Sequence, residues 1–145
     1  MDFENPSMDE IYTLIRETAT IAVVGLSPKP ERPSHGVARA LKDLGYRIIP
    51  VRPGVDEVLG EKAYGDLAKI PLSLRGEIDL VQVFRRPEHV DSIVERCIEL
   101  GLKTIWMQEG VIDNHAAEMA LEAGMTVVMD RCFYRDRLAL LRLAG

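Results

Sequence analysis

The fold is decided by residues 21–36, which read Ile-Ala-Val-Val-Gly-Leu-Ser-Pro-Lys-Pro-Glu-Arg-Pro-Ser-His-Gly. The apolar run Ile21–Val24 is short, rich in β-branched residues and closed by Gly25, a pattern that favours a strand buried on both faces. Pro33 and Ser34 indicate the start of a helix, with Ser34 as its N-cap. A buried strand, a proline-rich loop and a helix N-terminus are therefore expected in this order.

The loop between this strand and this helix has the chemistry of a phosphate site. A helix N-terminus presents unpaired N–H groups and a partial positive charge, and the loop that leads into it carries Ser27, Lys29 and Arg32. His35, in the first helical turn, could donate a hydrogen bond to phosphate while neutral. The alternative for His35 is a partly exposed, inert side chain. The stretch is thus a phosphate site in outline.

The rest of the chain alternates helical and strand patterns. The predicted helices cover residues 8–18, 33–44, 87–100 and 113–122 and a last segment around Leu138, Leu141 and Leu143; the predicted strands cover residues 48–51, 78–84, 104–108 and 126–129. Residues 55–71 are expected to be irregular, with one helical turn at residues 66–70. Three predicted helices end in a glycine, at Gly45, Gly101 and Gly124, and a strand follows each one closely. This repeated pattern of a helix, a glycine and a strand is typical of βαβ units with right-handed crossovers.

These units predict an α/β fold, a Rossmann-like three-layer α/β/α domain with a five-stranded, mostly parallel sheet. The expected strand order is 3-2-1-4-5, the commoner nucleotide-binding arrangement when the first loop carries the phosphate signal. Its switch point would lie between the first and fourth strands, so a ligand would meet the loop after Gly25 and the loop Gln108-Glu109-Gly110. Residues 1–145 are expected to form this one domain, with an N-terminal helix within residues 1–20 and a C-terminal helix within residues 133–145.

Composition places the chain among ordinary globular proteins, with 47% hydrophobic and 28% charged residues. No apolar run approaches the roughly 20 residues of a membrane span, and the N-terminus lacks signal features, so a cytoplasmic location is expected. The net charge of −5 argues against non-specific binding to nucleic acid or anionic membranes. Cys97 and Cys132 lack metal-ligand spacing and are expected to be reduced.

Basic residues gather at the predicted carboxyl edge of the sheet, although the protein as a whole is acidic. They follow the first, second, third and fifth strands, as Lys29, Arg32, Arg52, Arg85, Arg86 and Arg131. Arginine suits phosphate because its planar fork bonds two oxygens at once. The alternative is that these side chains cap carbonyl groups or pair with acids of the same rim, namely Glu31, Glu88, Glu109 and Asp130. An anion site is the favoured interpretation.

The first loop does not fit a dinucleotide such as NAD. That fingerprint needs glycines at the first, third and sixth positions and an acid at the end of the second strand. After Gly25 the next glycine is Gly36, and the second strand ends in Val51-Arg52-Pro53. Arg52 could hold a phosphate on the ribose, which indicates coenzyme A or NADP. The chain also lacks a Walker A loop, so nucleotide hydrolysis has no support.

Catalytic residues are not evident in the sequence. Asp79 and Asp130 are isolated carboxylates, and one acid without a positioned partner defines no mechanism. Cys132 beside Arg131 could be a reactive thiolate, but a buried, inert cysteine is the favoured interpretation. No histidine has metal-ligand spacing. We therefore expect a binding protein rather than an enzyme, and no metal site.

Several motifs, in this order, resemble the small bacterial and archaeal CoA-binding proteins, a family similar in fold to the CoA-binding domain of the succinyl-CoA synthetase α subunit. The motifs are Val24-Gly25-Leu26-Ser27-Pro28-Lys29-Pro30-Glu31-Arg32-Pro33, Tyr46-Arg47-Ile48-Ile49-Pro50-Val51-Arg52-Pro53, Val58-Leu59-Gly60-Glu61-Lys62-Ala63-Tyr64, Val83-Phe84-Arg85-Arg86-Pro87, Trp106-Met107-Gln108 and Asp130-Arg131-Cys132. The resemblance spans residues 21–132. It implies that residues 25–34 hold the pyrophosphate of CoA, that residues 51–53 border the adenosine end, and that residues 84–86 and 108–110 line the rest.

The resemblance and the basic rim together give one set of candidate cofactor-binding residues. They are Gly25, Leu26, Ser27, Lys29, Pro30, Arg32, Ser34, His35, Val51, Arg52, Pro53, Phe84, Arg85, Arg86, Gln108, Glu109, Gly110 and Arg131. Family members often carry asparagine at the position of Arg52, and an acid followed by histidine where this chain has Asp136 and Arg137. The chain also lacks a second domain that would supply a phosphorylated histidine, so the resemblance does not imply ligase activity.

The first hypothesis is therefore a domain that binds CoA or acyl-CoA through its 3′-phospho-ADP moiety, without catalysis. The alternatives are an NADP-linked oxidoreductase and a regulatory or assembly module in which CoA binding signals to a partner protein. A homo-oligomer or an unidentified protein partner stays open. A further hypothesis is that Cys132 forms a mixed disulfide with the CoA thiol under oxidation.

Overall fold

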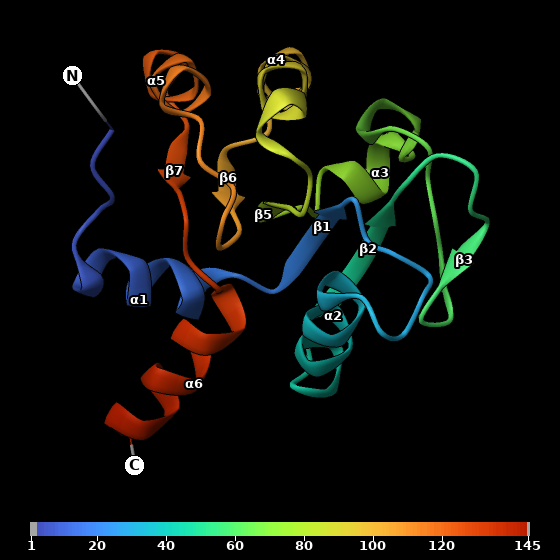
Figure 1. Ribbon diagram of the computed structural model, residues 1–145, viewed down its shortest axis with the longest axis horizontal. Coiled ribbons are helices and arrows are strands. Elements are labelled where there is room, and N and C mark those ends of the chain that lie inside the picture. Colours follow the sequence, from blue (N-terminus) through green and yellow to red (C-terminus); the bar gives the residue numbers. More distant parts are fainter. Residues whose placement is uncertain (1–2, 145) are drawn as a thin grey trace.

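Five parallel strands form the centre of the structure, a computed structural model that describes residues 3–144. In spatial order they are β2 (Arg47–Val51), β1 (Thr20–Val24), β5 (Leu80–Val83), β6 (Thr104–Met107) and β7 (Thr126–Val128). The helices are α1 (Met8–Glu17), α2 (Pro33–Asp43), α3 (Leu72–Arg75), α4 (Val90–Glu99), α5 (Asn114–Glu122) and α6 (Phe133–Ala144). Figure 1 shows α3, α4 and α5 on one face of the sheet and α1, α2 and α6 on the other. The predicted Rossmann-like α/β fold is confirmed.

The sheet is buried on both faces, so each strand contributes to two apolar cores. Val81 and Ile105 point to the core beneath α4 and α5, whereas Leu80 and Trp106 point to the core shared with α1, α2 and α6. The Trp106 ring packs edge-on against Phe133 of α6, with 5.0 Å between the ring centroids. Successive strand residues therefore alternate between cores, as the pleat requires. Trp106 is fully buried in this core.

The predicted strand order was wrong. The third strand of the sequence, β5, pairs with β1 and not with the outside of β2, so the order in chain numbering is 2-1-3-4-5. Pro50 explains the difference, because proline has no N–H to donate and is confined to edge strands. The outer edge of β2 is instead covered by Tyr64, whose N–H donates to Pro50 O at 3.0 Å and whose carbonyl accepts from Arg52 N at 2.7 Å. The switch point consequently lies between β1 and β5.

Side chains cap the N-termini of α1 and α5, whereas the cap predicted for α2 lies elsewhere in the structure. Ser7 caps α1 by accepting from Glu10 N, and Asp113 caps α5 by accepting from Ala116 N. Ser34, predicted to cap α2, lies one residue inside the helix, which begins at Pro33 with Arg32 as N-cap. Proline is favoured at the first helical position because its missing N–H would be unpaired there anyway.

The connection from β2 to β5 holds structure that the sequence patterns did not predict. A two-residue hairpin pairs β3 (Glu57–Val58) with β4 (Glu61–Lys62), and α3 follows the predicted helical turn, which is a 3₁₀ turn at Leu67–Lys69. Leu59 and Gly60 make the hairpin turn at positive φ, 56° and 76°. Strands of two residues are too short to show an alternating pattern, so this hairpin leaves no periodic signal.

Several predictions about the whole chain are tested only within residues 3–144. The domain bounds predicted at residues 1 and 145 lie outside the described residues. None of the helices in the described part is long and apolar enough to cross a lipid bilayer.

Cys97 and Cys132 are both free and buried, and burial raises the pKa of the Cys97 thiol to about 12. Neither thiol is therefore bridged to the other.

Candidate functional site

A groove of about 780 Å³ lies at the carboxyl edge of the sheet, where the loops after β1, β2, β5 and β6 meet. These are the loops at the arrowhead ends of the strands in Figure 1. The groove is lined by Gly25, Ser27, Lys29, Arg32, Pro33, Ser34, Arg52, Pro53, Phe84, Arg85, Arg86, Pro87, Gln108, Glu109, Gly110 and Val111. In open parallel sheets, ligands bind at this edge beside the switch point.

Gly25 lets the β1 loop lie directly against the loop after β5. Its φ is +89°, and a Cβ atom at this position would lie 2.5 Å from Phe84 O and 2.8 Å from Arg85 Cδ. Its N–H donates to Val51 O at 2.9 Å, which ties the same loop to β2. Only glycine combines this backbone conformation with this close approach. Gly25 therefore joins three strands at the floor of the groove.

Hydrogen bonds within the β1–α2 loop hold it against the start of α2. Ser34 Oγ accepts from Ser27 N at 3.0 Å, and Ser27 Oγ accepts from Lys29 N at 3.1 Å. Among the described residues, the first turn of α2 carries no acid and receives no side-chain cap. The partial positive charge of this helix end is therefore not compensated by a protein side chain and faces the groove.

Five cations line the groove without an acidic partner. Within residues 3–144, no ion pair shorter than 4.0 Å involves Lys29, Arg32, Arg52, Arg85 or Arg86. Two of the four acids at this rim are engaged elsewhere, since Glu109 pairs with Arg135 and Asp130 accepts from Gly110 N at 2.8 Å. The carbonyl-capping alternative holds in part for Arg52, whose Nη1 lies 3.3 Å from Gly25 O.

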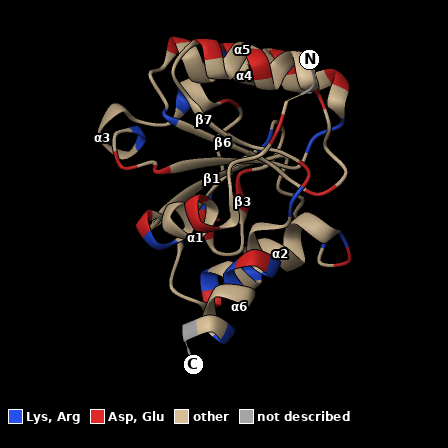
Figure 2. Ribbon diagram, turned by 90° about the vertical axis from the view of Figure 1, so that its left-hand side faces the viewer, with Lys and Arg blue, Asp and Glu red and all other residues tan. Residues whose placement is uncertain are grey.

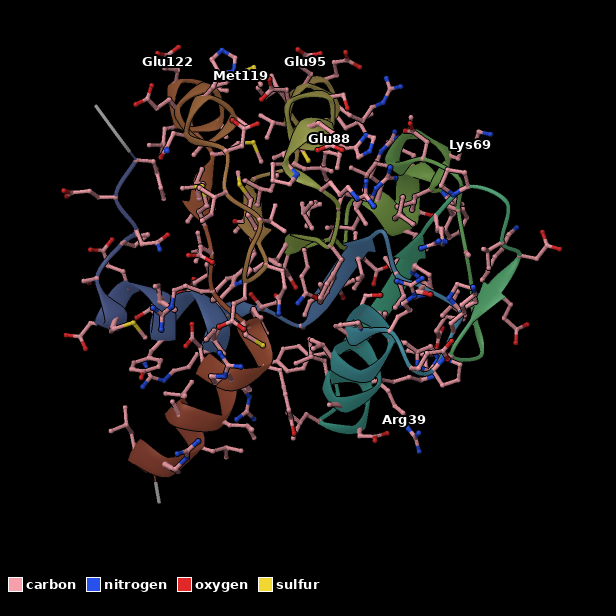
Figure 3. All side chains as sticks on the ribbon, in the orientation of Figure 1. Arg39, Lys69, Glu88, Glu95, Met119 and Glu122 are labelled. Carbon is pink, nitrogen blue, oxygen red and sulfur yellow. The ribbon has the colours of Figure 1, made fainter. Side chains whose placement is uncertain are left out.

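Many of the acidic residues that give the protein its net charge lie away from the groove. Figure 2 shows acidic segments along α4 and α5, the two helices at the top of the view. Figure 3 shows the side chains of Glu95 and Glu122 pointing from these helices away from the sheet, and Arg39 pointing outward from α2. The excess of positive charge at the groove is thus a local property, which the net charge conceals.

Thirteen of the eighteen candidate residues line the groove, and the other five lie around it. Leu26 is fully buried among the residues beneath α2. Pro30 is exposed at the tip of the loop, and His35 is half-buried in the first turn of α2. Val51 faces a neighbouring pocket of about 350 Å³, which shares Pro53 and Arg85 with the groove. The groove also includes Pro33, Pro87 and Val111, three neighbours of predicted residues that sequence reasoning missed.

Arg131, the fifth candidate outside the groove, is held by an internal carboxylate. Its Nε and Nη2 donate to the two oxygens of Asp136 at 2.7 and 2.8 Å, and Asp136 is only 5% exposed. The hydrogen bonds that the guanidinium donates to the Asp136 carboxylate raise the pKa of Arg131. The Arg131 carbonyl also accepts from Trp106 Nε1 at 2.8 Å. The structure therefore gives Arg131 a role in anchoring α6 to the sheet.

A family profile described as CoA binding domain matches residues 19–136. The chain belongs to this CoA-binding family. The membership predicted from the sequence motifs is thereby confirmed, and the matched residues contain every strand of the main sheet and the whole groove.

The relatives of this CoA-binding chain include both short and long proteins. A Bacillus subtilis protein described as uncharacterised, YneT, is 44% identical over 129 residues, which cover 89% of this chain and 93% of that protein. The α subunit of an ADP-forming acetate–CoA ligase II from Pyrococcus furiosus is 29% identical over 123 residues, 77% of this chain but 26% of the subunit. A solved hypothetical protein from Pyrococcus horikoshii OT3 superimposes with a TM-score of 0.87 at 34% identity, covering 97% of this chain and 99% of that one.

Proposed function

We propose that the protein binds coenzyme A or an acyl-CoA in the groove, with the 3′-phospho-ADP moiety at its basic end. The observation that carries this proposal is the set of five cations around the N-terminus of α2, which have no acidic partner and leave the helix uncapped as far as the described residues show. Such an arrangement favours a ligand with several phosphate groups, because helix N–H groups and guanidinium forks both bond phosphate oxygens. Membership of the CoA-binding family supports the same ligand.

In this proposal each loop holds a different part of the ligand. Arg52 follows β2, at the edge of the sheet, and would hold the phosphate on the ribose. Lys29, Arg32 and the start of α2 follow β1 and would hold the pyrophosphate. The arm that ends in the thiol would then run past Arg85 towards the loop after β6. Residues 1–145 form a single CoA-binding domain in this proposal.

The NADP alternative receives less support from the first loop. Dinucleotide sites place three closely spaced glycines around the pyrophosphate, whereas this loop is stiffened by Pro28, Pro30 and Pro33 and has one glycine, Gly25, before the helix. The groove lining also contributes no histidine, cysteine or tyrosine among the described residues. We therefore propose binding without a reaction. The chain spans about a quarter of the ligase subunit that it matches, and the activity of that subunit is not part of the proposal.

Calorimetric titration at low ionic strength tests the proposal. CoA should bind, dephospho-CoA should bind more weakly because it lacks the ribose phosphate, and NADPH should bind more weakly than CoA. Failure of both CoA and dephospho-CoA to bind at millimolar concentrations would contradict the proposal. Tighter binding of NADPH than of CoA would favour the oxidoreductase alternative.

A pair of variants locates the site. The double substitution Lys29→Gln with Arg32→Gln removes two charges from the loop and should weaken CoA binding by about 1.5–3 kcal/mol. The matched control is Arg39→Gln, which removes a charge from the exposed outer side of the same helix. The control should change the affinity by less than about twofold. Equal losses in the two proteins would place the ligand away from this loop.

A further inference from the structure

Two buried amide side chains lie beneath the β6 end of the groove. Gln82, in β5, is fully buried, and Gln108, directly after β6, is 5% exposed. Gln82 Nε2 donates a hydrogen bond to Gln108 Oε1 at 3.0 Å. Both residues lie on the face of the sheet that otherwise presents Val23, Leu80 and Trp106 to an apolar core. A polar pair at this depth therefore needs a physical reason.

The hydrogen bond fixes which end of the Gln108 amide faces the groove. Gln108 lines the groove, and its Oε1 is already used by Gln82. Within residues 3–144 its Nε2 has no protein acceptor, yet it is not among the fully buried atoms that lack a partner. The Nε2 group is therefore reached from the groove, as a donor whose orientation is set from behind.

The arrangement leaves Gln82 with an unsatisfied atom. Gln82 Oε1 is buried and has no hydrogen-bond partner among the described residues. A buried acceptor without a partner is unfavourable, and an apolar side chain of similar shape would avoid the cost. The bond to Gln108 does not need the oxygen of Gln82, only its NH₂ group. The presence of glutamine at position 82 is thus explained by the orientation that it gives to the Gln108 amide, and not by a contribution to the stability of the core.

The electrostatics of this end of the groove favour a neutral acceptor. The neighbouring Glu109 carboxylate is paired with Arg135, and the Gly110 N–H is taken by Asp130. The five unpaired cations all come from the loops after β1, β2 and β5. A lone amide N–H beside carboxylates suits a carbonyl oxygen better than a phosphate.

We infer that Gln108 donates a hydrogen bond to a carbonyl oxygen on the arm of the ligand beyond the pyrophosphate, and that Gln82 is its positioning residue. The inference rests on the proposed function. It follows from the strand order, because β6 lies three strand spacings from β2, about 14 Å. If the ribose phosphate lies at Arg52, the Gln108 amide faces the pantetheine amides or the thioester of an acyl-CoA.

The test compares two ligands on three proteins. CoA carries the arm, whereas adenosine 3′,5′-bisphosphate carries two phosphates and no arm. Gln108→Met should weaken CoA binding roughly 3- to 10-fold and leave the bisphosphate unchanged. Gln82→Met should weaken CoA binding roughly twofold to fivefold, because the Gln108 amide is then free to turn away from the ligand, and should not lower the thermal midpoint.

The outcomes separate this inference from the proposed function. If the wild-type protein binds neither ligand, the proposed function fails. If the wild-type protein binds both and Gln108→Met keeps the same ratio of CoA to bisphosphate affinity, the inference is overturned while the proposed function stands. If Gln82→Met weakens both ligands equally and lowers the thermal midpoint, Gln82 has a structural role only, and its positioning role is overturned.

Discussion

The two ends of the groove use side chains in opposite ways. At the end formed by the loops after β1, β2 and β5, five cations have no acidic partner within residues 3–144. At the β6 end every polar group that we have described is fixed from within, as Gln108 by Gln82 and Glu109 by Arg135. Unpaired charge acts over the Debye length and weakens in salt, whereas fixed donors act only on contact. The first end therefore attracts the phosphate groups of a ligand. The second end discriminates among the ligands whose phosphates the first end has already attracted.

The largest effect is expected at Gly25, which joins the loops after β1, β2 and β5 at the basic end of the groove. Gly25→Ala forces a Cβ atom to within 2.5 Å of Phe84 O at a φ of +89°. Backbone strain and overpacking should together lower the free energy of unfolding by about 3–5 kcal/mol. Denaturant unfolding measures this loss. CoA binding should also disappear, because the displaced loop carries the cations of the basic end.

Gly45→Ala is the matched control for this loss. Gly45 has a similar φ of +102°, but no neighbouring atom lies within 4 Å of an added Cβ. Only the strain of positive φ then remains, about 1–2 kcal/mol. Equal losses in the two variants would show that the contact with the β5 loop is not tight, and would contradict the close approach of the β1 and β5 loops at the basic end.

A smaller loss is expected when α6 is released from its anchor at Arg131. Arg131→Gln removes the partner of both oxygens of Asp136, which is almost fully buried. An unpaired buried carboxylate costs about 3 kcal/mol, and solvent around the half-buried Arg131 reduces the loss to about 2 kcal/mol. Denaturant unfolding again measures it.

Arg96→Gln provides the comparison for Arg131, because it breaks only exposed ion pairs, with Asp66 and Glu99. That substitution should cost less than about 1 kcal/mol. The affinity for adenosine 3′,5′-bisphosphate should survive in Arg131→Gln protein that is still folded. A large loss of that affinity would return Arg131 to the phosphate site predicted from the sequence.

The third expected effect is on ligand affinity and not on stability. Arg52→Gln should weaken CoA binding about tenfold and bring the affinities for CoA and dephospho-CoA close together, because one charge-assisted phosphate contact is lost. Stability should change by less than about 0.5 kcal/mol. Arg47→Gln, at the other end of β2, is the control and should leave both affinities unchanged. A preserved preference for CoA in Arg52→Gln protein would place the ribose phosphate at another cation.

The basic end of the groove could be predicted from the sequence, and the fixed end could not. Lys29 and Arg32 are local signals, since they stand between a strand and a helix start whatever the sheet order. The partner of Arg131 is five residues away on the next helix, and the partner of Gln108 is 26 residues away on another strand. Such pairs depend on register and side-chain direction, which periodicity does not encode.

The strand order was the one error in the fold that the sequence could have prevented. Pro50 lies within an apolar strand pattern, and a proline there argues that the strand is at an edge of the sheet. An internal second strand, as in the order 3-2-1-4-5, would have needed the N–H that Pro50 lacks. The hairpin from Glu57 to Lys62 gave no comparable signal. The burial of Gln82 and its pairing with Gln108 could not be predicted either. One glutamine in an apolar run is expected to be exposed unless its neighbour on the adjacent strand is known.

The smallest expected effect on CoA affinity tests whether the charges at the β6 end nearly cancel one another. Arg135→Gln releases the Glu109 carboxylate from its exposed ion pair, so the free carboxylate should repel the phosphates of CoA and weaken binding about twofold at low salt. Glu109→Gln should do the reverse by a similar factor. Both changes should fade at high salt, since the groups are exposed and separated from the phosphate loop by about a Debye length. If Arg135→Gln weakens CoA and Glu109→Gln does not strengthen it, Arg135 itself contacts the ligand, and the division between a charged end and a neutral end moves one strand further along the sheet.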